Sequence, residues 1–269
     1  MKSDEISEFG LIIIKSLPES EPQTGTDLHS SIIKYKKFKE PNLRSDLYDV
    51  NSAQDFFVLL EMLYNRAVND KYFFVLHLEM HGYDDGIRMK NGDKISWKNI
   101  LPYFRKINVE FCNYLAVYLA VCKSANLLQY IDPLDWAPFR AIVTTPKDIL
   151  LRDLIPGFEA FYDHFFFELD AQESIEKYNA AISPDGSKMY LITAKYSFDT
   201  ITDIERKTAD TKSILEIIKS SLLSKQPHLK YTPIVLHMLA EKEMKNTFDE
   251  LKKNKSYFLM KDLDEDIPM

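Results

Sequence analysis

The stretch Y-F-F-V-L-H-L-E-M-H-G-Y-D-D-G, residues 72–86, decides the fold predicted for this chain. It begins as an apolar run and closes on His81-Gly82, and a second apolar run, Tyr114–Val121, closes on Cys122. Runs of this length, rich in β-branched and aromatic residues, are typical of buried parallel strands. If the two strands lie side by side, His81 and Cys122 meet at one edge of a sheet. In open α/β sheets, ligands bind at that carboxyl edge.

Composition and charge are those of a folded domain that binds no nucleic acid. The chain has 269 residues, of which 45% are hydrophobic and 28% charged, as is ordinary for a globular protein. The formal net charge is −7, whereas nucleic-acid-binding domains are usually basic. We therefore expect a partner of another chemical class.

The cysteine count indicates a reducing compartment. The chain has two cysteines, Cys112 and Cys122, and no Cys/His spacing typical of a zinc site. Acidic residues precede the first short apolar run, so no signal peptide is predicted. No apolar run approaches the roughly 18 residues of a membrane helix. We expect a cytoplasmic protein with no metal, no cofactor and no membrane contact.

Strand and helix patterns alternate along most of the chain. Strands are expected over residues 11–15, 43–50, 72–79, 114–121, 140–144 and 189–194. Helices are expected over residues 28–38, 53–68, 97–107, 149–169, 172–182, 200–223 and 233–253, with a hairpin over residues 83–95. This alternation predicts an α/β fold with about six mostly parallel strands between two helical layers.

The end of the chain differs from the rest because only helices are expected there. We therefore predict an α/β domain over residues 1–199 and a helical extension over residues 200–269, packed on or beside that domain. The spacing of apolar residues in the two predicted helices is amphipathic, which is typical of helices that cover another surface.

Cys122 and His81 are the candidate catalytic residues. Cysteine reacts as the thiolate, its free pKa is about 8.5, and a neighbouring histidine promotes its ionisation. The His81 imidazole could then pass the proton to a leaving amine. Gly82 permits close backbone approach, so the N–H groups of Gly82 and Cys122 are candidates for an oxyanion hole. The alternative is a structural cysteine and an unrelated loop histidine.

Glu79 and His77 are expected to share a strand face with His81. Glu79 lies two residues before His81, and it could orient the imidazole or pair with a basic residue. His77 lies deeper on the same face and is expected to be a core histidine. Cys112 is expected to pack in the interior.

Residues 9–145 resemble the caspase-like (clan CD) cysteine peptidases, of the bacterial caspase or CHAT-like type. The resemblance is carried by V-L-H-L-E-M-H-G (75–82), by L-A-V-Y-L-A-V-C (115–122), and by the helix W-K-N-I-L-P-Y-F-R-K-I-N (97–108) between them. It implies a three-layer caspase-like fold and a thiol protease that cleaves protein substrates with a Cys122/His81 dyad. It also implies a regulated effector in stress or phage defence, activated by a partner protein or a small signalling ligand such as a nucleotide.

The chain departs from caspases in the residues that select substrate. Caspases carry Q-A-C-R-G around the nucleophile, whereas this chain has A-V-C-K-S (120–124). Gln23, in Q-T-G-T-D (23–27), stands where caspases have an arginine that binds an acidic P1 residue. Loss of that charge predicts a basic or neutral P1 preference. Asp132 or Asp135 could bind a basic P1 side chain, or both could be solvent-facing turn residues.

Other functions receive less support. A non-catalytic relative with the same fold, which binds a protein or a ligand without cutting, is the main alternative. A different α/β hydrolase is disfavoured because no G-x-S-x-G motif is present. No phosphate-binding glycine motif occurs either, so nucleotide hydrolysis and a dinucleotide cofactor are not expected.

Overall fold

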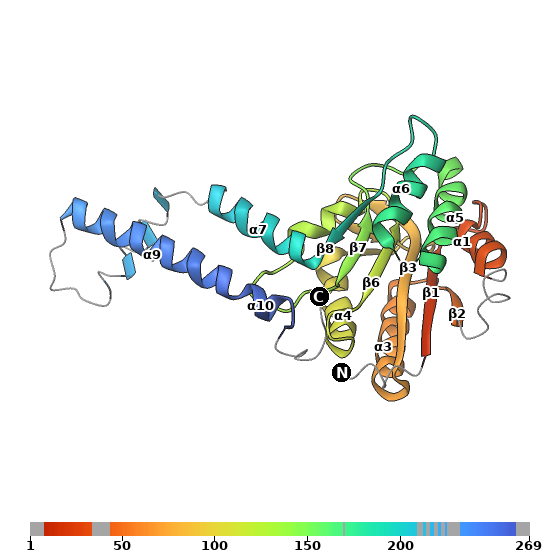
Figure 1. The fold of residues 1–269 in the computed structure, drawn as a ribbon, viewed down its shortest axis with the longest axis horizontal. Coiled ribbons are helices and arrows are strands. Elements are labelled where there is room, and N and C mark those ends of the chain that lie inside the picture. The colour runs from red at the N-terminus through yellow and green to blue at the C-terminus, as the bar shows by residue number, and fades with distance from the viewer. Residues whose placement is uncertain are drawn as a thin grey trace.

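The computed structural model describes residues 8–33, 44–168, 170–208, 212–213, 216–217, 220–221, 224 and 232–261. A single main sheet runs through the protein, with strand order β2-β1-β3-β6-β7-β8 (Figure 1). Its strands are β1 (Glu8–Ser16), β2 (Arg44–Asp49), β3 (Tyr72–Tyr83), β6 (Ala116–Ala120), β7 (Ala141–Thr144) and β8 (Tyr190–Thr193). The first five are parallel and β8 is antiparallel to β7. The predicted strands and the mostly parallel sheet are confirmed.

Helices cover both faces of this sheet. On one face, here called the α3 face, lie α3 (Ala53–Asp70) and α4 (Trp97–Glu110). On the other, the α1 face, lie α1 (Thr24–Leu28), α5 (Leu151–Glu168) and α6 (Ala171–Ala181). Successive strand residues point to opposite faces, so Val75 packs on the α1 face and Leu76 on the α3 face. The three-layer architecture is confirmed.

Local sequence signals explain where helices begin. Ser52 starts α3 with a capping box, because its hydroxyl accepts the N–H of Asp55 and the Asp55 carboxylate accepts that of Ser52. The predicted start of the helix expected over residues 28–38 is wrong. The carbonyl of Gln23 accepts the N–H groups of Thr26 and Asp27, so helical structure begins at Thr24. It continues as the π-helical turn η2 (His29–Ile33), and residues 34–38 lie outside the described chain.

The hairpin expected over residues 83–95 is larger than predicted. Strand β3 continues past His81 to Tyr83, where it pairs with β4 (Gly86–Arg88), and β4 pairs with β5 (Lys94–Ser96). The last residues of β3 therefore belong both to the end of the main sheet and to this small antiparallel extension. This arrangement holds the backbone around His81 on two sides.

The C-terminal helices form an arm that extends away from the sheet (Figure 1). It comprises α7 (Ala194–Thr208) and α9 (Pro233–Lys253). Helix α7 follows β8 directly and so crosses the boundary predicted at residues 199–200. The short helix α10 (Lys255–Phe258) returns to the domain. Phe258 is fully buried there, with its ring centroid 5.2 Å from that of Phe198.

No helix among the described residues is long and apolar enough to cross a membrane. Residues 212–224 are described only in part, so the predicted helix over 200–223 is established only as far as Thr208.

Candidate active site

The pairing of β3 with β6 brings His81 and Cys122 to one edge of the sheet. The parallel register runs from Leu76 opposite Val117 to Glu79 opposite Ala120. Strand β6 ends at Ala120, and Cys122 follows in a turn with its carbonyl against Gly82, the residue after His81. Because side chains alternate along a strand, His81 shares the face of Glu79, and Cys122 shares the face of Ala120. Ala120 packs on the α1 face, so both candidate catalytic side chains project from that face.

Backbone contact between the two motifs is direct at Gly82. A Cβ atom added to Gly82 would lie 2.0 Å from the carbonyl oxygen of Cys122 and 2.8 Å from Cγ1 of Val121. Any larger residue would therefore push the two strand ends apart. The glycine that follows His81 is needed for this close approach.

The thiol of Cys122 is partly exposed and has a backbone hydrogen-bond donor. The N–H of Ile149, in the loop before α5, donates to Sγ of Cys122 over 3.2 Å. Sequence reasoning missed this donor because Ile149 is 27 residues away along the chain. The chain turns away sharply after the thiol because Lys123 adopts a left-handed conformation, with φ 55°.

The segment after Cys122 forms the 3-10 helix η3 (Ser124–Tyr130). It is anchored by the N–H of Lys123, which donates to Lys147, and by the hydroxyl of Thr144, which donates to Ser124 over 2.7 Å. The Lys123 amine lies 2.8 Å from the Asp84 carboxylate. That hydrogen bond raises the pKa of Lys123, which keeps a positive charge beside Cys122.

The His81 ring has a carboxylate partner that the sequence analysis did not identify. Nε2 of His81 lies 2.9 Å from Oε2 and 3.1 Å from Oε1 of Glu21, in the loop between β1 and α1. The two residues are 60 positions apart, and no local pattern links them. The only signal available was an acidic residue in the loop that follows a parallel neighbouring strand.

Glu79 pairs with the core rather than with His81. Its side chain is 3% exposed, and Oε2 lies 3.8 Å from Nε2 of His77. The other ring nitrogen of His77, Nδ1, is 2.8 Å from the hydroxyl of Tyr162. The core position of His77 is therefore confirmed, and an orienting contact of Glu79 with His81 is not found among the described residues. Burial raises the pKa of Tyr162 far above its ordinary value, so this hydroxyl stays neutral.

Gln23 has its amide group occupied within its own loop. Its Nε2 donates to the carbonyl oxygens of Pro18 and Glu21 over 2.9 and 3.0 Å. Its Oε1 accepts from Nζ of Lys15 over 2.6 Å. The side chain holds the loop that carries Glu21, and substrate contact by Gln23 stays a prediction.

Asp132 and Asp135 lie away from the candidate dyad. The loop that carries them leads to Ala137, which accepts from buried Asn108 at the amino end of β6. Asp135 forms an ion pair of 3.0 Å with Arg105, and Asp132 accepts from the N–H of Leu134. Cys122 follows the carboxyl end of β6, so the structure does not bring these aspartates to it.

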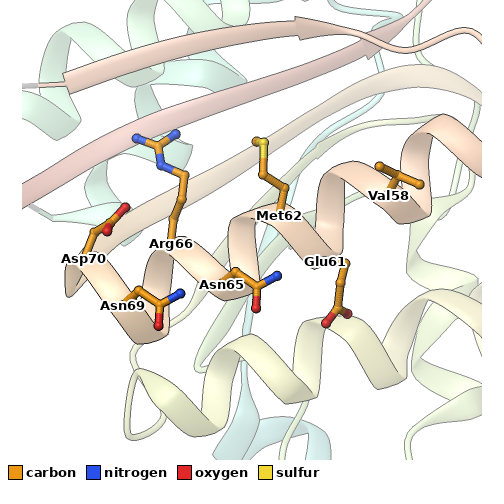
Figure 2. Close-up of a pocket in the computed structure, with 7 residues that line it drawn as sticks. All are labelled: Val58, Glu61, Met62, Asn65, Arg66, Asn69 and Asp70. Atoms are coloured by element: carbon orange, nitrogen blue, oxygen red, sulfur yellow. The ribbon is translucent and has the colours of Figure 1, made fainter.

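A shallow depression of about 450 Å³ lies on the outer surface of α3 (Figure 2). All of its lining residues come from that one helix: Val58, Glu61, Met62, Asn65, Arg66, Asn69 and Asp70. Arg66 already pairs with Asp46 over 2.9 Å. The depression is on the α3 side of the sheet, whereas His81 and Cys122 project from the α1 face, so it forms no part of the candidate site.

Metal ligation has no support in the part of the chain that the structure describes. No group of three His, Cys, Asp or Glu side chains there could hold a metal ion. The chemistry available to the site is that of a thiol, an imidazole, a carboxylate and backbone N–H groups.

Comparison with known proteins bears on the fold. No protein-family model and no curated protein matches the chain. Among solved structures, it is similar to the crystal structure of the Drosophila initiator caspase Dronc, with a TM-score of 0.53 and 16% sequence identity. The match covers 72% of this chain and 82% of that chain. The chain has a caspase-like fold.

At this low identity, the similarity shows the fold alone. The caspase-like fold confirms the predicted fold class of a mostly parallel sheet between helices.

Proposed function

We propose that this protein is a cysteine endopeptidase that cleaves protein substrates with a Cys122/His81 dyad. The observation that carries the proposal is the placement of partly exposed Cys122, just after the end of β6, against Gly82 at the end of β3, next to the partly exposed His81 ring. The caspase-like fold supports it, because carboxyl edges of parallel sheets are where α/β proteins bind ligands.

The proposed chemistry begins with transfer of the Cys122 thiol proton to His81. The thiolate sulfur attacks the carbonyl carbon of the scissile peptide, and the N–H groups of Gly82 and Cys122 are the proposed donors to the oxyanion. Collapse of this intermediate breaks the C–N bond, and the leaving amine takes the proton from His81. Water then hydrolyses the thioester with His81 as base, which restores the thiol.

We propose a basic or neutral side chain at P1. Gln23 is neutral where caspases carry an arginine, and a carboxylate, Glu21, lies 2.9 Å from the His81 ring. An acidic P1 side chain would meet like charge there, which disfavours binding. Asp132 and Asp135 give no support to this preference because they lie at the other end of β6.

Activation by a partner protein or a signalling ligand, and a role in stress or phage defence, stay predictions from the resemblance. The loop between Cys122 and β7 is short and contains η3, so cleavage of this loop is not expected to be the trigger. Activity assays therefore need candidate activators as separate additions.

The direct test is a panel of fluorogenic peptides that differ only in P1, with arginine, lysine, leucine and aspartate, assayed with and without activators. Wild type is expected to cleave the arginine or leucine peptides faster than the aspartate peptide. Cys122→Ala is expected to abolish cleavage, and Cys112→Ser, which alters the other cysteine, is expected to retain it.

A peptide chloromethyl ketone supplies a second measurement on the same variants. It should label wild type and Cys112→Ser once, at residue 122, and leave Cys122→Ala unlabelled. If wild type and Cys122→Ala behave alike in both measurements under every activator, the protein is a non-catalytic binding relative.

A further inference from the structure

The loop between β1 and α1 holds a carboxylate against the ring of His81. Both oxygens of Glu21 lie within 3.1 Å of Nε2. The side chains are 33% exposed for His81 and 40% for Glu21, so solvent reaches the contact. We infer that Glu21 is a positioning residue for His81, which makes the proposed dyad a Cys122–His81–Glu21 triad. This inference rests on the proposed function.

The contact assigns different tasks to the two ring nitrogens. In the neutral imidazole, one nitrogen carries hydrogen and the other has a lone pair. An Nε2–H that donates to Glu21 leaves the lone pair on Nδ1, which is then the atom that accepts the Cys122 proton. The carboxylate also stabilises the imidazolium that forms, and Nδ1 later returns the proton to the leaving amine.

Hydrogen bonds brace the loop that presents this carboxylate. The N–H of Glu21 donates to the carbonyl of Pro18 over 3.0 Å, and the carbonyl of Glu21 accepts from Nε2 of Gln23 over 3.0 Å. Lys15, whose side chain is 8% exposed, donates to Gln23 over 2.6 Å and pairs with Asp49 over 2.9 Å. An exposed ion pair is usually weak because two mobile side chains must be ordered. Here the backbone of Glu21 is already held in place by these hydrogen bonds, so less ordering is needed to form the contact with His81.

Glu79, the acidic residue on the same strand face as His81, cannot take this role. Glu79 is sealed beneath α1, because a Cβ atom added to Gly25 would lie 2.8 Å from its Oε2. Its Oε2 lies 3.8 Å from Nε2 of His77. Among the described residues, Glu21 is therefore the carboxylate that meets the His81 ring.

The experiment compares Glu21→Ala and Glu21→Gln with Glu19→Ala, which removes an exposed acid from the same loop. With the peptide that wild type cleaves best, Glu21→Ala is expected to lower kcat by about 10- to 100-fold with little change in KM, the size expected for one lost charge-assisted hydrogen bond. Glu21→Gln keeps an acceptor oxygen without the charge, so its kcat should be intermediate. Glu19→Ala should match wild type.

Two readouts do not need peptide cleavage. Nitrogen-15 spectra of the ring, assigned to His81 by its loss in His81→Ala, should show hydrogen on Nε2 in wild type and a mixture of tautomers in Glu21→Ala. The rate of alkylation of Cys122 by iodoacetamide at neutral pH should fall in Glu21→Ala and remain unchanged in Glu19→Ala.

These readouts separate the two ways of failing. If Cys122→Ala abolishes cleavage while Glu21→Ala matches Glu19→Ala in kcat, ring spectrum and alkylation, the positioning role of Glu21 is wrong and the peptidase stands. If wild type cleaves no peptide under any activator, the proposed peptidase fails, and the ring spectrum and alkylation rate still decide whether Glu21 orients His81.

Discussion

The amino and carboxyl edges of the main sheet differ in how their polar groups are buried. At the amino edge, buried Asn108 accepts from the N–H of Leu115 and donates to the carbonyl of Ala137, and α10 closes over them with buried Phe258. At the carboxyl edge, His81 and Cys122 remain partly exposed. Their partners, Glu21 and the N–H of Ile149, come from loops.

This difference indicates that the carboxyl edge of the sheet is the one that can bind a substrate. At the amino edge, the buried amide of Asn108 has its partners within the protein, which contributes to stability. Polar groups of the carboxyl edge have partners that a substrate can supplement, and loops carry them because loops tolerate exposed backbone. Substitutions at the carboxyl edge should therefore change activity more than stability, and those at the amino edge the reverse.

The largest expected effect on activity is that of His81→Ala. Loss of acid–base help should lower kcat by about 10²–10⁴-fold. The melting temperature should stay close to that of wild type, because the ring is partly exposed. Steady-state kinetics on the best peptide and a thermal melt provide the test. A melt that collapses while kcat per folded molecule is retained would assign His81 to the stability of the sheet.

Phe258→Ala should cost a free energy similar to that of His81→Ala, but the loss should be in folding stability and not in catalysis. Removal of a fully buried aromatic ring costs about 3–5 kcal/mol of unfolding free energy. Denaturant titration should show this loss, while kcat of the folded protein stays unchanged because α10 closes the amino edge. An equal loss of kcat would mean that the two edges are coupled.

Gly82→Ala should reduce activity by displacing the two catalytic strand ends. A Cβ atom at this position meets the Cys122 carbonyl at 2.0 Å, and a displacement near 1 Å can cost about 10²-fold in rate. The matched substitution is Gly92→Ala, where a Cβ has open space but φ is +94°. It should cost about 1 kcal/mol of stability through backbone strain and leave kcat unchanged. Kinetics and denaturant titration on both variants test the contrast.

Asp135→Ala should leave P1 selectivity unchanged. The carboxylate pairs with Arg105 at the amino edge, so the ratio of kcat/KM for arginine and leucine peptides should stay the same as in wild type. A fall in that ratio would show that the loop of Asp135 reaches the substrate.

The smallest effect is an acid-dependent loss of stability at the carboxyl edge. Burial raises the pKa of Asp49, but hydrogen bonds from Lys90 and Lys15 outweigh it and hold the pKa below 3.8. A lowered pKa contributes stability above the unfolded value, which disappears as pH falls through the folded value. Wild type should therefore exceed Asp49→Asn by at most about 1 kcal/mol at neutral pH, with no difference at strongly acidic pH. Denaturant titrations across that range measure it; a constant difference would contradict it.

Strand patterns predicted much of this protein because their information is local. Tyr72–Glu79 and Tyr114–Val121 are apolar on both faces, and such runs form central parallel strands wherever helices cover the sheet. Parallel neighbours end at a common edge, so the positions of His81 and Cys122 at their ends already indicated that they would lie near each other. The alternation predicted only the α/β class, whereas the caspase-like fold was implied by the resemblance of residues 9–145.

Side-chain partners were less predictable because they depend on the paths of loops. Glu79 is close to His81 in sequence, but strand geometry and α1 bury it beside His77. Asp135 follows Cys122 closely along the chain, but η3 runs back along the sheet and delivers it to Arg105. The length of a loop does not determine its direction.

The amino-acid sequence by itself therefore determined the layers, the strand order of the central pair and the thiol and imidazole at its end. These depend on hydrophobic periodicity, which each segment carries independently. Only the tertiary structure decided that Glu21 meets the His81 ring and that the N–H of Ile149 meets the Cys122 sulfur. Such contacts join residues from separate loops, and they exist only once the packed sheet has set the ends of those loops in space.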